Sequence, residues 1–159
     1  MLSCSSLQPL NETAANESGM IHFILNVLTD KFSICRLPSS AKLPGWLPEI
    51  PAGFCSVTRT KDELSIVCQT CHLPAEIRAE HGWRCLQIAG PLDFELVGVM
   101  ARLTTALAAA DVSVFVVSTF ETDYLLVKAE QLPAAVTALK QAGHSVRQCD
   151  TRDHTDAYG

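Results

Sequence analysis

The chain has 159 residues, of which 48% are hydrophobic, 18% are charged and 6% are aromatic. This length and apolar content allow a core without disulfides or a structural metal, and they exclude disorder for most of the chain. Twelve basic residues against 17 acidic ones give a formal charge of −5. Because a nucleic-acid-binding surface needs a positive face, we expect no nucleic-acid partner.

No apolar run is long enough to cross a bilayer, and the N-terminus lacks the basic start and apolar centre of a signal peptide. Seven cysteines, an odd number without a regular spacing, are typical of reduced thiols. We therefore expect a cytoplasmic protein without a membrane partner. The polar residues 1–19 and 150–159 are expected to be flexible tails.

The first predicted element after the N-terminal tail is a loop. Four prolines lie between Leu37 and Pro51 and prevent a long regular helix there. We expect one short helical turn in this segment, with Trp46 packed on a sheet. A strand, a polar turn and a second strand are predicted over Val57–Val67. A helix with proline in its first turn is predicted after Leu73, ending near Gly82.

A second set of elements follows with a cleaner pattern. Trp83–Ala89 predicts a strand, and Asp93 is a good N-cap for an apolar helix from Phe94 to about Ala110. The β-branched run Val112–Ser118 predicts a buried strand. The order is completed by a strand over Tyr124–Lys128, a helix striped by Leu132, Val136 and Leu139, and a strand over His144–Cys149.

Two segments of these sets repeat. Val57–Val67 aligns with Val117–Val127 at an offset of 60, and the segment from Leu73 aligns with that from Leu132 at an offset of 59. Matches in the same order predict duplicated modules. We expect an α+β protein of two tandem ferredoxin-like βαββαβ modules, over residues 20–82 and 83–149, the first degenerate in its first helix.

The residues that carry a family resemblance are spread over both modules. They are Phe32–Leu37, Ser56–Thr60, Asp62–Val67, Gly82–Arg84, Gly90–Phe94 and Val117–Tyr124. In these segments the chain resembles the small tandem ACT-domain proteins, which are related to aspartate kinase regulatory domains and to cytosolic arginine sensors. The resemblance covers about residues 20–149, and it implies the tandem βαββαβ fold, amino-acid binding and no catalysis by the module.

The turn Gly90–Asp93 and the predicted helix start are the first candidate site. Free N–H groups and the helix dipole suit an anion such as an α-carboxylate. Gly98 allows a ligand to approach the first turns closely. The alternative is that Asp93 only caps the helix and Gly98 only packs. The candidate residues at this end are Leu92, Asp93, Phe94, Gly98 and Val99.

The polar segment Ser118–Asp123 is the second candidate site. A carboxylate of Glu121 or Asp123 could pair with a ligand ammonium, while Thr119 could hydrogen-bond the ligand and Phe120 could cover it. The alternative is a solvated hairpin turn.

The resemblance to the arginine sensors adds to this second site. It implies that Thr119, Phe120 and Asp123 help to hold the ligand, together with the strand backbone at Ser113 and Val114. It also places Glu95 or Leu96 at the helix-start acidic position of the sensors, so arginine specificity does not follow from it.

A thiol-redox or zinc-binding function is the alternative from a different class. Cys68, Cys71 and His72 form a CxxCH string. A redox function would require Cys71 to lie at a helix start that activates its thiol, which the predicted helix after Leu73 allows. A haem is not expected, because its attachment needs an exported compartment. We expect no cofactor and no enzymatic activity. A free amino acid and a second copy of the chain, paired along the strand edge from Ser113, are the expected partners. A structural interaction module with an empty turn is the remaining possibility.

Overall fold

The computed structural model describes residues 21–47, 53–92 and 95–149. The expected tails, 1–19 and 150–159, lie outside these ranges. The strands in the described ranges are β1 (Ile24–Val27), β2 (Phe32–Leu37), β3 (Ser56–Arg59), β4 (Leu64–Gln69), β5 (Ala79–Ile88), β6 (Phe115–Ser118), β7 (Asp123–Lys128) and β8 (Ser145–Gln148). The helices there are α1 (Val99–Ala109) and α2 (Leu132–Gln141), with short 3₁₀ turns η2 (Thr70–His72) and η3 (Ala129–Gln131).

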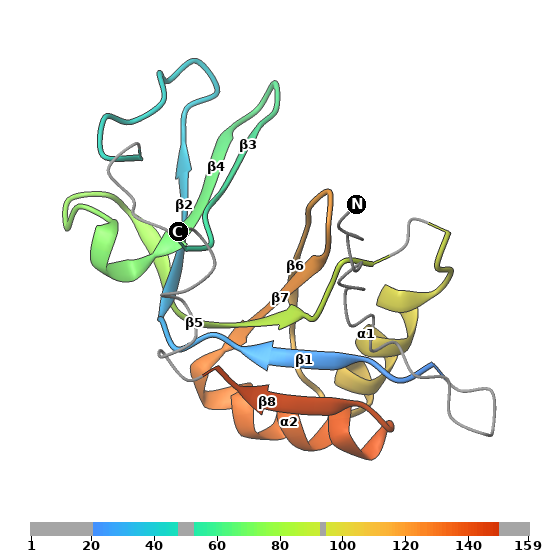
Figure 1. Cartoon of the computed structure of the whole chain (residues 1–159). Helices are drawn as coiled ribbons and strands as arrows, with labels where there is room; N and C mark the ends of the chain where they lie inside the picture. The colour runs from blue at the N-terminus through green and yellow to red at the C-terminus, as the bar shows by residue number, and fades with distance from the viewer. Residues whose placement is uncertain (1–20, 48–52, 93–94, 150–159) are drawn as a thin grey trace, which may run out of the picture.

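The long strand β5 joins the two halves of one mixed sheet (Figure 1). Its first residues pair antiparallel with β2, and its later residues pair antiparallel with β1 on one side and with β7 on the other. Trp83 lies at the junction, because it is in register with Phe32 of β2 and with Lys128 of β7. The halves therefore share a strand and are not separate bodies joined by a linker.

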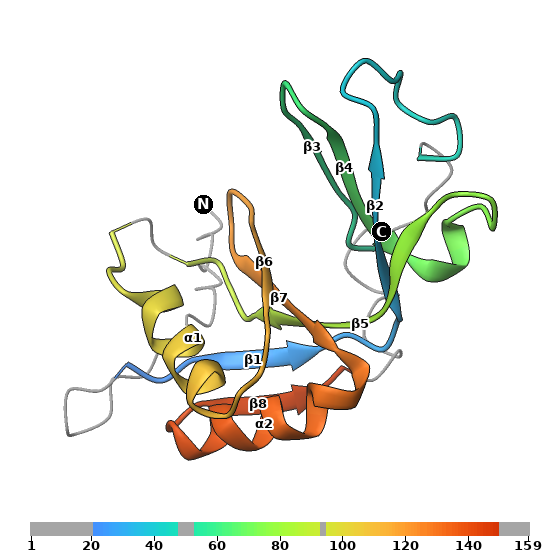
Figure 2. The same ribbon diagram turned by 180° about the vertical axis from the view of Figure 1, so that it is seen from behind.

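Both helices pack against the half of the sheet that contains β1, β5, β7 and β8 (Figures 1 and 2). The main core lies between them and includes Leu103 of α1, Leu139 of α2 and Leu125 of β7, each at most 1% exposed. The side chains of this core alternate along the strands and recur at helical spacing, as burial of one face requires. The expected α+β, ferredoxin-like class is confirmed.

The strand β1 departs from the expected division of the chain. It lies between β5 and β8, antiparallel to the first and parallel to the second, and thus widens the sheet of the second half. The boundary expected between residues 82 and 83 falls inside β5. Strand pairing therefore does not follow the expected ranges 20–82 and 83–149, because β1 completes the sheet on which the helices pack.

The repeat is present, at a single offset of 59 and not at two offsets. Arg59 pairs with Leu64 at the end of the first hairpin, and Ser118 pairs with Asp123 at the end of the second. Both turns close in the same way: Thr60 N–H donates to Glu63 O at 2.9 Å, and Thr119 N–H donates to Thr122 O at 2.8 Å. The turns η2 and η3 stand at the same offset. The sequence alignment at an offset of 60 paired similar residues, but it was one residue out of register with the structural repeat.

The first half of the chain contains less helix than the sequence predicts. The segment after Leu73 forms a turn, in which Ile77 N–H donates to Pro74 O at 3.1 Å, and β5 begins at Ala79. The helix predicted there is therefore wrong, because the chain extends early into the shared strand. Trp46 packs as expected, against the buried cluster of Cys35, Leu64, Ile66 and Cys68.

The helix α1 begins later than the sequence predicted. Its first residue is Val99, and its N-cap is Gly98, with φ 77° in the left-handed region. The predicted start at Phe94 is wrong, and Asp93 and Phe94 lie outside the described residues. Glycine is the residue that adopts this backbone conformation without steric cost. It turns the chain into the helix with no side-chain cap.

A buried histidine ties β1 to the segment before β8. His144 is 7% exposed, and its Nδ1 accepts a hydrogen bond from Phe23 N–H at 3.2 Å. Burial lowers the pKa of His144 from its ordinary value, helped by the nearby His22 and Arg102. The proton that would block this acceptor is thus bound more readily by the unfolded chain than by the folded one.

We predict that the free energy of unfolding falls as the pH drops through and below 6.5, the ordinary histidine value. Below this pH the unfolded chain binds a proton at His144 more strongly than the folded chain does, so the contribution of neutral His144 to stability, which is present above this pH, is lost below it. Urea unfolding at about pH 7.5 and about pH 5.5 measures the effect.

The variant His144→Asn keeps an acceptor but cannot titrate, and it should flatten this pH dependence. His72→Asn is the matched control and should leave it unchanged. An equal slope in wild type and His144→Asn would contradict the assignment.

Candidate ligand-binding site

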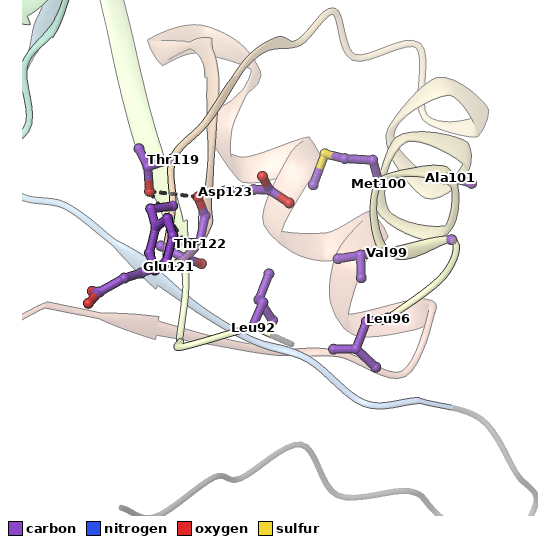
Figure 3. Close-up of a pocket in the computed structure, with 11 residues that line it drawn as sticks. Leu92, Leu96, Val99, Met100, Ala101, Thr119, Glu121, Thr122 and Asp123 are labelled. Atoms are coloured by element: carbon purple, nitrogen blue, oxygen red, sulfur yellow. Dashed lines mark hydrogen bonds between the residues drawn. The ribbon is translucent and has the colours of Figure 1, made fainter. Parts of the chain in front are cut away.

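A cavity of about 320 Å³ lies between the start of α1 and the turn that joins β6 to β7 (Figure 3). It combines one end of a helix, one hairpin turn and the segment that follows β5. The residues that line it are Leu92, Leu96, Gly98, Val99, Met100, Ala101, Thr119, Phe120, Glu121, Thr122 and Asp123.

The first turn of α1 forms one wall of this cavity. Gly98, Val99, Met100 and Ala101 all line it, and the hydrogen bond from Arg102 N–H to Gly98 O, at 3.1 Å, closes the first turn. The N–H groups before Arg102 have no acceptor within the helix, as at any helix start, and the N-cap residue Gly98 has no side chain that could cap them. With the positive end of the helix dipole, these donors favour a carboxylate.

The hairpin turn opposite is rigidly held to the segment after β5. Thr122 Oγ1 donates to Ile88 O at 2.6 Å, and Leu92 N–H donates to Glu121 O at 2.8 Å. A Cβ placed on Gly90 would lie 3.2 Å from Glu121 O and from Thr122 Cβ, so the two segments touch closely. Thr119 Oγ1 is occupied within the turn, where it donates to Thr122 O at 2.9 Å. These hydroxyls shape the cavity and are not spare ligand donors.

Asp123 directs its carboxylate toward Met100 and the start of α1 (Figure 3). The side chain is half-buried, and within the described residues no hydrogen bond or ion pair joins its carboxylate. Glu121 is exposed, and in the same view its carboxylate extends away from the helix. The two acidic candidates are thus separated by geometry: Asp123 faces the cavity and Glu121 faces outward.

The remaining wall is apolar and continuous with the main core. Leu92, Leu96 and Met100 are half-buried and pack against the core cluster, while Val99 is 8% exposed. Phe120, at the mouth, is 81% exposed. The cavity therefore has a polar end at Asp123 and the helix start, and an apolar side formed by core residues.

Most of the expected site residues meet at this cavity. The lining contains Leu92, Gly98, Val99, Thr119, Phe120, Glu121 and Asp123. Ser113 and Val114 are not part of it: Ser113 is exposed, and Val114 packs against the main core. Asp93 and Phe94 lie outside the described residues. Sequence reasoning missed Met100 and Ala101, which follow once Gly98 marks the helix start. It named Leu96 only as a possible match to an acidic position, and it gave Thr122 no role within the polar segment.

The alternative site at Cys68, Cys71 and His72 has a different environment. Cys68 is fully buried in β4, and burial raises the pKa of its thiol to about 12, with smaller contributions from Cys35, Cys55 and Cys71. Cys71 is exposed on η2. A thiol with a raised pKa is a poor nucleophile and a poor metal ligand. No set of three or more metal-ligating side chains occurs in the described residues.

Comparison with known proteins places this architecture in a family. A model of the ACT domain matches residues 78–141, and a model of an N-terminal domain matches residues 30–76. A solved protein of Agobacterium tumefaciens is 36% identical, with a TM-score of 0.76, and the match covers 84% of this chain and 98% of that one. The chain belongs to the ACT-domain family.

More distant relatives agree with this ACT-domain fold. The regulatory subunit of aspartate kinase from Thermus thermophilus matches 74% of this chain and 95% of its own length, at 17% identity and a TM-score of 0.53. The human protein named cytosolic arginine sensor for mTORC1 subunit 1 is 37% identical over 60 residues. That match covers 37% of this chain and 18% of the sensor, so the chain spans less than a fifth of this curated relative.

The described part of the ACT-domain chain contains no helix that is both long and apolar enough to span a membrane.

We predict that Thr122→Val destabilises the protein by about 1–3 kcal/mol, because it leaves the buried carbonyl of Ile88 without the hydroxyl that donates to it. Urea unfolding measures the loss. The control is Thr104→Val on α1, whose hydroxyl donates at 2.6 Å to Met100 O on a partly exposed helix face, and we expect a change within about 0.5 kcal/mol. Equal effects of the two substitutions would contradict the role assigned to Thr122.

Proposed function

We propose that this ACT-domain protein is a regulatory protein that binds a free α-amino acid in the cavity between α1 and the β6–β7 turn. The observation that carries the proposal is that one wall of the cavity favours a negatively charged group and the opposite wall favours a positively charged one. A helix start whose N-cap residue is a glycine lies on one wall, and the carboxylate of Asp123 points toward it from the other. A zwitterion presents the complementary carboxylate and ammonium groups.

The ligand carboxylate is assigned to the first turn of α1. The N–H groups of Val99, Met100 and Ala101 lie at the positive end of the helix dipole, where an anion is stabilised. The site predicted at the Gly90–Asp93 turn thus moves along the chain to Gly98. Leu92 stays in it as part of the lining.

The ligand ammonium is assigned to Asp123. The internal repeat supports this assignment, because the equivalent residue in the first hairpin is Leu64, which is fully buried in an apolar cluster. A carboxylate replaces a core side chain only in the hairpin that borders the cavity. Among the described residues no hydrogen bond or ion pair joins the Asp123 carboxylate, so it can accept hydrogen bonds from a ligand ammonium.

Binding in this place would act as a signal by fixing α1 against the hairpin. A ligand that touches both elements favours the arrangement in which they are closest, and that preference is the regulatory output. Catalysis is not part of the proposal. The human relative is named as a cytosolic arginine sensor. On the basis of that similarity we extend amino-acid binding and a cytosolic location to this chain as proposals.

A homodimer belongs to the same proposal. In the described sheet β6 pairs only with β7, and β3 pairs only with β4, so both are edge strands. Ser56–Thr58 of β3 and Phe115–Ser118 of β6 border one groove of about 340 Å³. Exposed edges are an aggregation hazard unless they are paired, and a second copy carries edges that could pair with them.

We predict that at least one free amino acid raises the melting temperature in a thermal-shift panel. At a ligand concentration of about 100 times Kd the stabilisation is about 2.7 kcal/mol, which is several degrees for a chain of this size. Asp123→Asn should abolish the shift while the circular dichroism spectrum stays that of the wild type.

Two variants serve as matched controls. Glu121→Gln should keep the shift, because that carboxylate is exposed and points away from the helix. Asp62→Asn, which changes the residue equivalent to Glu121 in the first hairpin, should also keep it. No shift with any of the twenty amino acids would contradict the proposal, and loss of the fold in Asp123→Asn would make Asp123 a structural residue.

A further inference from the structure

In the proposed function, one part of the cavity binds the ammonium and carboxylate groups of the amino acid, and another part surrounds its side chain. The polar end of the cavity, Asp123 and the start of α1, is assigned to the ammonium and the carboxylate. The surface left for the ligand side chain consists of Leu92, Leu96, Val99 and Met100. All four pack in the main core cluster or against it. A ligand side chain that enters this space therefore leaves water for an apolar environment.

The charges around the cavity make this side-chain space selective. Within the described lining the ionisable residues are Asp123 and Glu121, and no lysine, arginine or histidine is among them. An acidic ligand side chain would meet only like charge there. A basic one would compete for the single carboxylate that faces the cavity, since Glu121 extends outward (Figure 3). A charge placed against Leu92, Leu96 and Met100 instead would lose hydration without gaining a partner.

We propose that the ligand is a neutral amino acid with an apolar side chain, and that arginine is disfavoured. This inference rests on the proposed function and adds the class of the ligand. Burying an apolar side chain contributes about 25 cal/mol for each Å² removed from water. The aliphatic side chains of Leu92, Leu96 and Val99 give a guanidinium no hydrogen-bond acceptor. Discrimination arises from the wall of Leu92, Leu96 and Met100, while the polar end binds the groups that all amino acids share.

The test is isothermal titration of the full chain with leucine, isoleucine, valine, methionine, phenylalanine, arginine, lysine and glutamate. We expect the tightest binding from an apolar member, with arginine weaker by at least about tenfold, which corresponds to about 1.4 kcal/mol. If arginine or glutamate binds as tightly as the best apolar amino acid, the inference is overturned while the proposed function stands. If none of the eight binds, the inference fails, and the full panel of twenty then decides the proposed function.

A pair of variants tests the wall directly. Leu96→Glu places a carboxylate on the apolar side, so the affinity for the best apolar ligand should fall and that for arginine should rise. Leu96→Gln removes the apolar surface without adding charge, and it should lower the first affinity without raising the second. Leu43→Glu, at a residue that is 62% exposed, is the control and should change neither. Equal ligand affinities in Leu96→Glu and wild type would show that Leu96 does not contact the ligand and would contradict the role of this wall. If Leu96→Glu does not fold, the wild-type titrations decide the inference.

Discussion

The hydrogen bond from Thr122 Oγ1 to the carbonyl of Ile88, 2.6 Å long and buried, fixes the turn after β6 to the end of β5. A second hydrogen bond, 2.8 Å long, runs from Leu92 N–H to Glu121 O and attaches the next segment of the chain to the same turn. Because α1 is reached only through that segment, the position of the helix start relative to the turn depends on both bonds. The sheet holds β5 and β7 in register, so the turn on one side of the cavity and the segment that leads to α1 on the other are both anchored to it. Asp123, the first residue of β7, follows this turn directly.

Comparison of the two repeated hairpins shows why the proposed site is assigned to one turn and not to the other. The two hairpins close with the same hydrogen bonds, from Thr60 N–H to Glu63 O and from Thr119 N–H to Thr122 O. They differ in what lies beside them. The first turn is followed by Leu64 in a buried apolar cluster, and no α-helix is found in the described part of that half. The second is followed by Asp123 and faces the start of α1, where the N-cap residue is Gly98. The repeated hairpin thus borders the proposed site in only one of its two copies.

The sequence predicted the elements whose pattern is local. The apolar spacing from Leu132 identified α2, and the β-branched run before Ser118 identified β6. The prediction of a buried strand from Val112 was wrong, because β6 begins at Phe115 and is an edge strand in which Val116 and Ser118 are exposed. It also indicated the polar turn that lines the cavity. Local pattern could not place β1, because its partners β5 and β8 are distant in the chain and only tertiary pairing selects them. It misplaced the start of α1 because Asp93 has the chemistry of a cap, whereas the chain enters the helix through the left-handed backbone of Gly98. The helix expected after Leu73 was overridden by pairing of β5 with β2.

Asp123 and the start of α1 are the two groups on which the account depends, and they can be observed separately from any change in stability. The most direct measurement is the amide chemical-shift map of the ¹⁵N-labelled chain, titrated with the amino acid that binds. The account predicts that the largest changes fall on Val99, Met100 and Ala101 and on the turn from Thr119 to Asp123, while the equivalent turn from Thr60 to Leu64 stays unchanged. Changes confined to the first hairpin, or to the β3 and β6 edges with the α1 amides unaffected, would contradict it.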